Sequence, residues 1–136
     1  MSFLLDTNVV SELRKGKRCH AGLARWYATL QDADIFLSVL TLGEIRRGVE
    51  RIRRRDPASA GVLEDWLARL LREHAERVLP VDARVADEWG RLNVPDPLPA
   101  VDGLLAATAR VHDLTLATRD FGGVARTGVR LVNPFA

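Results

Sequence analysis

Short apolar runs alternate with longer stretches of helical periodicity along the chain. β-favouring apolar runs predict five strands, at residues 2–5, 35–39, 77–81, 114–118 and 129–133. Apolar residues at helical spacing predict helices at residues 8–15, 20–30, 83–92 and 101–112, one that begins at Thr41, and one that follows Pro57. Strands separated by helices predict an α/β three-layer sandwich, with a central, mostly parallel sheet and helices on both faces.

The composition adds limits to this picture. A chain of 136 residues with 47% hydrophobic and 28% charged residues is typical of one globular domain, here residues 1–136, and not of a disordered protein. Cys19 is the only cysteine, which excludes an internal disulfide. No apolar run approaches the roughly 18 residues of a membrane-spanning helix, and no secretion leader is evident. We therefore expect a cytoplasmic protein with no membrane partner.

Four acidic residues stand at the ends of predicted strands or the beginnings of predicted helices. Asp6 directly follows the first strand, and Asp120 lies two residues after the fourth. Glu44 and Asp102 lie in the first turns of two predicted helices. Because parallel strands all end at the same rim of a sheet, where ligands gather, we expect these four carboxylates to line one acidic pocket.

Each acid taken alone also has a simpler explanation. Glu44 could complete a capping box with Thr41, Asp102 could favour a helix N-terminus by its charge, and Asp120 could be a turn residue. Their convergence favours function, because two carboxylates about 5 Å apart repel by about 3 kcal/mol at an effective dielectric of 20. A cation would relieve that repulsion, and ligands that are all oxygens favour Mg²⁺ or Mn²⁺ over zinc.

Arginines gather in runs even though the formal net charge is only +2. Of the 20 basic residues, only Lys15 and Lys17 are lysine. One run covers residues 14–18, and each run alone is typical of a solvated helix face. Together they favour a polyanionic partner, since the guanidinium fork suits phosphate oxygens. The predicted contacts to that partner are Arg46, Arg47, Arg51, Arg53, Arg54 and Arg55.

Four stretches that cover nearly the whole chain carry a family resemblance: LLDTNVVSEL, LSVLTLGEIRRGVE, AVDGLLAATARVHDLTLATRD and TGVRLVNPF. In this order they resemble the successive sequence blocks of the PIN-domain family, and most of all its VapC-type toxin ribonucleases from bacterial toxin–antitoxin pairs. The resemblance implies a metal-dependent endoribonuclease. Its catalytic acids would be Asp6, Glu44, Asp102 and Asp120, with Asn8 and Thr118 as polar residues that orient them. Many relatives have asparagine in place of Asp120 and an aspartate where this chain has Gly123.

The resemblance also implies a mechanism. Asp6 and Asp102 would hold Mg²⁺ or Mn²⁺, which lowers the pKa of an attacking water and polarises the scissile phosphate, and Asp120 would contribute to a second ion. Glu44 is the predicted residue that positions or deprotonates the water. Hydrolysis by water leaves a 5′-phosphate and a 3′-hydroxyl.

The partners expected on this basis are an RNA substrate, a cognate antitoxin and a second copy of the chain. An amphipathic antitoxin segment is expected to dock between the helices at residues 11–30 and 41–71, and a homodimer is expected through the later helices. Two alternatives stay open: a housekeeping PIN nuclease in RNA processing, and a PIN domain that binds RNA or a partner without cleaving. A haloacid-dehalogenase-type phosphatase fits less well, because Asn8 stands where its second aspartate would be.

Overall fold

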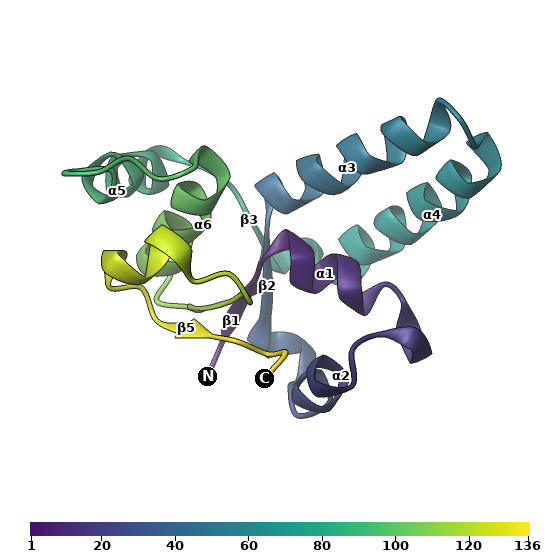
Figure 1. Ribbon diagram of the computed structural model, residues 1–136, viewed down its shortest axis with the longest axis horizontal. Helices are drawn as coiled ribbons and strands as arrows, with labels where there is room; N and C mark the ends of the chain where they lie inside the picture. Colours follow the sequence, from purple (N-terminus) through teal and green to yellow (C-terminus); the bar gives the residue numbers. More distant parts are fainter.

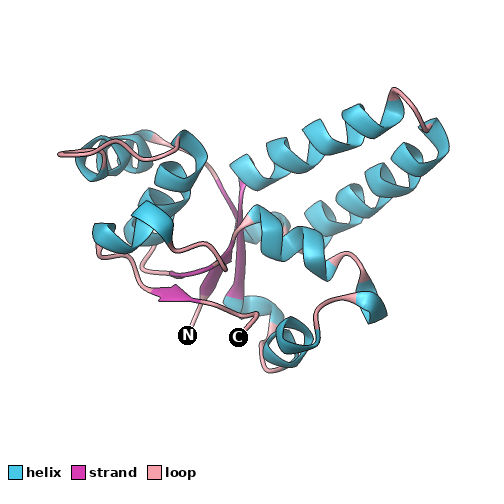
Figure 2. Cartoon of the chain, viewed as in Figure 1, coloured by secondary structure: helices cyan, strands magenta, loops and turns pink.

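Five parallel strands form one sheet in the order β3-β2-β1-β4-β5, in a computed structural model that describes residues 1–136. The strands are β1 (Phe3–Leu5), β2 (Ile35–Ser38), β3 (Val78–Leu79), β4 (Thr115–Ala117) and β5 (Leu131–Val132). All four pairings between neighbouring strands are parallel. β1 lies at the centre of the molecule, and helices surround the strands on both sides (Figures 1 and 2).

Six α-helices connect these strands. They are α1 (Thr7–Leu13), α2 (Ala21–Ala28), α3 (Val39–Arg53), α4 (Pro57–Glu73), α5 (Ala83–Leu92) and α6 (Ala100–Val111). Short 3₁₀ turns add η1 (Gly16–Arg18), η2 (Asp32–Asp34), η3 (Ala75–Arg77) and η4 (Gly122–Thr127). The α3–α4 pair forms a helical hairpin whose turn lies far from the sheet (Figure 1). No helix has the length and apolar character needed to span a bilayer.

Two hydrophobic cores lie on opposite faces of the sheet, because side chains alternate along a strand. Phe3 and Leu5 of β1 pack into the core beneath α1, α2, α3 and α4, together with Trp66. Leu4, between them in the sequence, packs into the other core, with Leu105 of α6. The predicted three-layer α/β sandwich is confirmed.

The predicted beginning of α3 is wrong. This helix begins at Val39, and the Ser38 hydroxyl caps it by accepting a hydrogen bond from the Leu40 amide at 3.0 Å. Thr41 therefore lies inside the helix and is fully buried, so it forms no capping box with Glu44. Glu44 consequently stands one turn further along the helix than predicted, and the simpler explanation for this acid falls away.

The third and fifth strands are shorter than the apolar runs that predicted them. β3 contains only Val78 and Leu79, because the next residue, Pro80, has no amide hydrogen to donate to a neighbouring strand. β5 is likewise limited to residues 131–132. The order of strands and helices along the chain is otherwise as predicted.

Candidate active site

The strand order changes direction at β1, which places a crevice at the carboxyl ends of β1 and β4. β2 and β3 lie on one side of β1, and β4 and β5 lie on the other. The Asp6 amide donates to the Ala117 carbonyl oxygen at 3.1 Å, so the two strands stay paired up to their ends. Ligand sites in parallel sheets form at such a switch point. Asp6 and Asp120 follow the two strands that flank it.

Asp6 directly follows β1 and is the N-cap of α1. Its Oδ1 accepts a hydrogen bond from the Val9 amide at 2.9 Å, and the residue is only 9% exposed. Burial raises the pKa of the Asp6 carboxyl above its ordinary value, and the charge of Asp102 adds to the rise. Hydrogen bonds with the Thr118 hydroxyl and the Val9 amide lower the pKa without cancelling the rise. A cation next to this buried carboxylate would stabilise its charged form.

Asp102 lies in the first turn of α6, as predicted. The residue as a whole is exposed. Partial burial of its carboxyl group is the main cause that raises the pKa of Asp102, and the negative charges of Asp120 and Glu44 raise it further. Together with the effect of Asp102 on the pKa of Asp6, this links all four predicted acids by electrostatic repulsion.

One small polar pocket contains three of the four acids. Its volume is about 120 Å³, and its lining residues are Asp6, Thr7, Asn8, Glu44, Val101, Asp102 and Leu105. These residues come from the end of β1, from α1, from α3 and from α6, so segments far apart in the sequence meet here. The structure thus brings together at one pocket three of the four acids that the sequence predicted there, Asp6, Glu44 and Asp102. Asn8, the predicted supporting residue, lies among them.

Asp120 lies outside this pocket. Its amide donates to the Thr118 hydroxyl at 3.1 Å, so the segment after β4 turns back on itself. A Cβ built at Gly122 would lie 3.1 Å from the Asp120 Oδ1, which shows that the carboxyl group folds toward that glycine. Asp120 therefore acts on the pocket through its charge on Asp102, and Thr118 connects both sides by contacting Asp6 and Asp120.

Thr7 holds Glu44 in place, a role that the sequence analysis missed. The Thr7 hydroxyl donates a short hydrogen bond to the Glu44 Oε1. The Thr7 hydroxyl oxygen also lies 3.3 Å from the Thr41 hydroxyl oxygen. The partners are 34 and 37 residues away in the sequence. Only the position of Thr7 directly after Asp6 could have indicated this role.

The donor chemistry of the pocket fits a hard divalent cation. The side-chain atoms that could bind a metal are all oxygens, and the mutual repulsion of the carboxylates favours a compensating charge. However, no three acidic, histidine or cysteine side chains lie close enough to form a metal site as they stand. Binding would thus require the carboxylates to approach each other. Asp102 and Asp120 are both exposed.

The six arginines predicted to contact RNA do not form an uncompensated basic surface around the acidic pocket. Arg46 forms ion pairs with Glu50 and Glu64, and Arg53 contacts the same two carboxylates. The other four lie exposed along the second half of α3 and at the turn of the α3–α4 hairpin: Arg47, Arg51, Arg54 and Arg55. The turn of this hairpin points away from the sheet (Figure 1).

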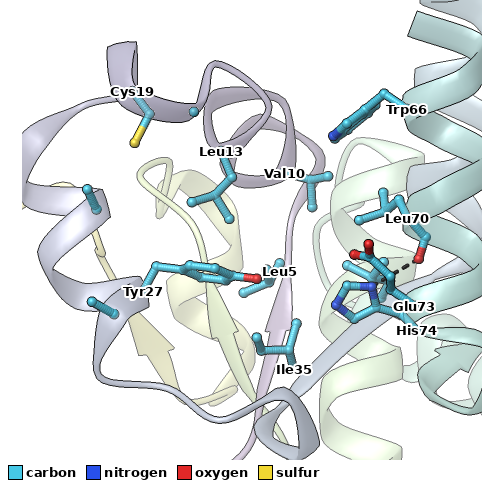
Figure 3. Close-up of a pocket in the computed structure, with 14 residues that line it drawn as sticks. Leu5, Val10, Leu13, Cys19, Tyr27, Ile35, Trp66, Leu70, Glu73 and His74 are labelled. Carbon is cyan, nitrogen blue, oxygen red and sulfur yellow. Dashed lines mark hydrogen bonds between the residues drawn. The ribbon is translucent and has the colours of Figure 1, made fainter.

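A larger cavity, of about 360 Å³, lies on the other side of α1 and contains no acid of the pocket. Figure 3 shows Leu13 of α1 and Tyr27 of α2 on one side of it, and Trp66 and Leu70 of α4 on the other. Of its 14 lining residues, 11 are hydrophobic, and Glu73 adds a carboxylate at its edge. Such a lining suits an apolar side chain better than a hydrolytic reaction.

Comparisons with known proteins agree with this arrangement. The PIN domain family model matches residues 3–128. The chain is 35% identical to Toxin FitB of Neisseria gonorrhoeae over 97% of both proteins. It is 32% identical to VapC ribonuclease Y4jK of Sinorhizobium fredii, over 97% of this chain and 96% of the relative. The crystal structure of FitAcB from Neisseria gonorrhoeae superimposes with a TM-score of 0.89 at 34% identity, over 98% of both chains.

Proposed function

The chain belongs to the PIN-domain family, and we propose that it is the ribonuclease toxin of a toxin–antitoxin pair, with the acidic pocket as its active site. The observation that carries this proposal is the meeting of Asp6, Glu44 and Asp102 in one pocket, from three distant segments. The names of the relatives, a toxin and a VapC ribonuclease, support the same reading.

Asp6 and Asp102 are the residues that would hold a divalent cation, and Asp120 would join them through rotation of its exposed side chain. A bound Mg²⁺ or Mn²⁺ ion would polarise the scissile phosphate and lower the pKa of the attacking water. Asp6 is anchored by the Val9 amide, so its carboxylate is preorganised to bind. Because the pKa of both Asp6 and Asp102 is raised, protons compete with the cation, and affinity increases with pH through that range.

Glu44 is the proposed residue that positions and deprotonates the attacking water. The Thr7 hydroxyl donates to one of its carboxylate oxygens, which leaves the other free to accept a hydrogen bond from water. Asn8, at the exposed edge of the same pocket, can donate from its side-chain amide to a phosphate oxygen or to the water. This division of roles accounts for every polar residue that lines the pocket.

RNA cleavage tests the nuclease proposal. Purified wild-type protein should cleave total RNA with Mg²⁺ or Mn²⁺ and should not cleave it in EDTA. Asp6→Asn and Asp102→Asn should both be inactive while their circular-dichroism spectra stay unchanged. Cleavage by either variant at the wild-type rate would show that the pocket is misassigned.

The antitoxin is the proposed occupant of the apolar cavity between α1, α2 and α4. An active ribonuclease toxin has to be restrained inside the cell that makes it. The cavity offers apolar walls for the apolar face of an amphipathic segment, and Glu73 at its edge can pair with a basic residue (Figure 3). An arginine or lysine of the same segment can pair with the carboxylates of the acidic pocket. The cavity lies between two of the helical regions for which the sequence predicted a docking groove.

Co-purification tests the antitoxin proposal. The protein should co-purify with the product of the small open reading frame next to its gene, and that product should suppress RNA cleavage. Leu70→Asp places a charge in the cavity and should abolish co-purification while RNA cleavage persists. Val62→Asp is the matched control, because Val62 is 70% exposed on the same helix. Equal co-purification of the antitoxin with both variants would show that the antitoxin does not dock in this cavity.

A further inference from the structure

A second polar cavity adjoins the acidic pocket and has the opposite charge. It measures about 320 Å³, and none of its lining residues is hydrophobic: Asn8, Ser11, Glu12, Arg14, Lys15 and Arg119. All but one of them come from α1 and from the two residues after it, whereas Arg119 follows β4. Three cationic side chains and one carboxylate line the cavity, which leaves it with an excess of positive charge.

The carboxylate in this cavity is already engaged. The Glu12 Oε1 forms an ion pair with Lys15 at 3.0 Å, and its Oε2 accepts a hydrogen bond from the His20 amide at 3.0 Å. The pKa of Glu12 is lowered, mainly by the hydrogen bond with Lys15 and to a smaller degree by the charge of Arg119. Glu12 therefore stays ionised and offsets Lys15, and the two arginines supply the remaining charge.

Neither arginine of the cavity forms a salt bridge, in contrast to Arg46 and Arg53 on α3. The Arg119 guanidinium carbon lies 3.5 Å from the centroid of the Phe135 ring, so a cation–π contact holds the group at the cavity without neutralising it. Arg14 is exposed at the C-terminal end of α1. Both guanidinium groups thus keep their hydrogen-bond donors available for an anion.

The two cavities lie next to each other. Asn8 lines both of them, and it lies two residues after Asp6 on the first turn of α1. Ser11 and Arg14 also line a third cavity. Thr7 and Glu44 line both this third cavity and the acidic pocket. An RNA strand that is cleaved at the acidic pocket therefore has polar side chains beside it along α1, as far as the two arginines without salt bridges, Arg14 and Arg119.

We propose that Arg14 and Arg119 bind the phosphodiester backbone of RNA on one side of the scissile phosphate, with Lys15 at the edge of the same cavity. This inference rests on the proposed ribonuclease function and names the residues that hold its substrate. The acidic pocket repels a polyanion, and the basic cavity next to it supplies the compensating attraction. Phosphate contacts of this kind position the strand without reading its sequence.

The test is the salt dependence of RNA binding, measured by fluorescence anisotropy with a short fluorescein-labelled single-stranded RNA of mixed sequence. EDTA keeps the RNA intact. The double variant Arg14→Gln/Arg119→Gln should flatten the slope of log affinity against log salt concentration by about 1.4, since each lost contact to a single strand removes about 0.7. The Arg119→Lys variant should keep most of the wild-type slope, because it keeps the charge.

Arg69→Gln/Arg72→Gln is the matched control. It also removes two exposed guanidinium groups without salt bridges, but from α4, where neither residue lines the acidic pocket, the basic cavity or the apolar cavity. This control should keep the wild-type slope, and thermal unfolding should show that both double variants are folded. An unchanged slope for Arg14→Gln/Arg119→Gln, or equal flattening by the control, overturns the inference.

Two further outcomes separate the inference from the proposed function. If the wild type binds RNA through Arg14 and Arg119 yet does not cleave RNA with Mg²⁺ or Mn²⁺, the phosphate-binding cavity stands and the ribonuclease proposal falls. If the Arg14→Gln/Arg119→Gln variant loses only the co-purifying antitoxin and keeps its RNA salt slope, the cavity binds protein, and the inference is overturned.

Discussion

Replacing Asp6 by asparagine and by alanine separates its two roles, as a helix cap and as a buried charge. Asparagine keeps an oxygen that accepts from the Val9 amide but carries no charge. Alanine removes both the cap and the charge. The difference in stability between the two variants therefore measures the cap, and the difference between wild type and Asp6→Asn measures the charge.

The expected sizes follow from the structure. Loss of a cap of this type costs about 1 kcal/mol, so Asp6→Ala should unfold at a temperature about 4 °C below that of Asp6→Asn. Since burial raises the pKa of Asp6, its charged form destabilises the metal-free protein at neutral pH. Asparagine carries no charge at this position and therefore avoids that unfavourable contribution. Asp6→Asn should therefore be more stable than wild type in EDTA at pH 7.

This advantage has a defined pH dependence. A carboxyl group whose pKa is higher in the folded state than in the unfolded state binds its proton more tightly when folded, so folding is favoured as pH falls. The ordinary value is 3.8, and the unfavourable contribution develops as pH rises from there through the raised pKa. The stability advantage of Asp6→Asn over wild type should thus be largest at pH 7 and should shrink toward pH 4.

Urea denaturation in EDTA at several pH values measures these differences, with circular dichroism as the signal. A second series of measurements is made with added Mn²⁺. At ten times its dissociation constant, Mn²⁺ should raise the free energy of unfolding of wild type by about 1.4 kcal/mol, and that of Asp6→Asn by less. The reasoning is refuted if Asp6→Asn is destabilised as much as Asp6→Ala, or if its advantage over wild type does not change with pH.

Further predictions concern activity and RNA binding. Asp102→Asn should abolish RNA cleavage, whereas Asp120→Asn should reduce it less, because Asp120 lies outside the pocket; initial rates at saturating metal distinguish the two. Thr7→Val leaves the pocket glutamate without its hydroxyl partner and should lower kcat by about ten- to a hundredfold, with little change in the free energy of unfolding. Neutralising Arg46 and Arg53 should change the RNA salt slope less than neutralising the two arginines beside the acidic pocket, since carboxylates already compensate both. A larger change would indicate that RNA binds along α3.

The hydrophobic pattern predicted the order of elements and the meeting of three of the four acids. Strand ends and helix beginnings can be located from the sequence, and in a parallel sheet they share one rim, so Asp6 and Asp102 could be placed together. The beginning of α3 could not be decided locally, because Ser38 and Thr41 are both capping residues. Only the end of β2 and the burial of Thr41 select Ser38.

The arginines show a second limit of the sequence. The contact of Arg46 with Glu50 is an i, i+4 pair that could be read from spacing, but Glu64 reaches it from α4. A run of charge does not reveal which of its members tertiary contacts neutralise. Conversely, Arg14 and Arg119 are more than a hundred residues apart and line one cavity only because α1 follows β1 and β4 pairs beside it.

The chemistry of the RNA ends tests the central claim most directly, that the acidic pocket hydrolyses RNA with metal-activated water. RNA cut by the wild-type protein with Mg²⁺ or Mn²⁺ should carry 5′-phosphate and 3′-hydroxyl ends, detected by selective ligation and sequencing. The same ends should be missing in EDTA and with Asp6→Asn. Cyclic phosphate at the 3′ ends, or equal cleavage in EDTA, would contradict the account.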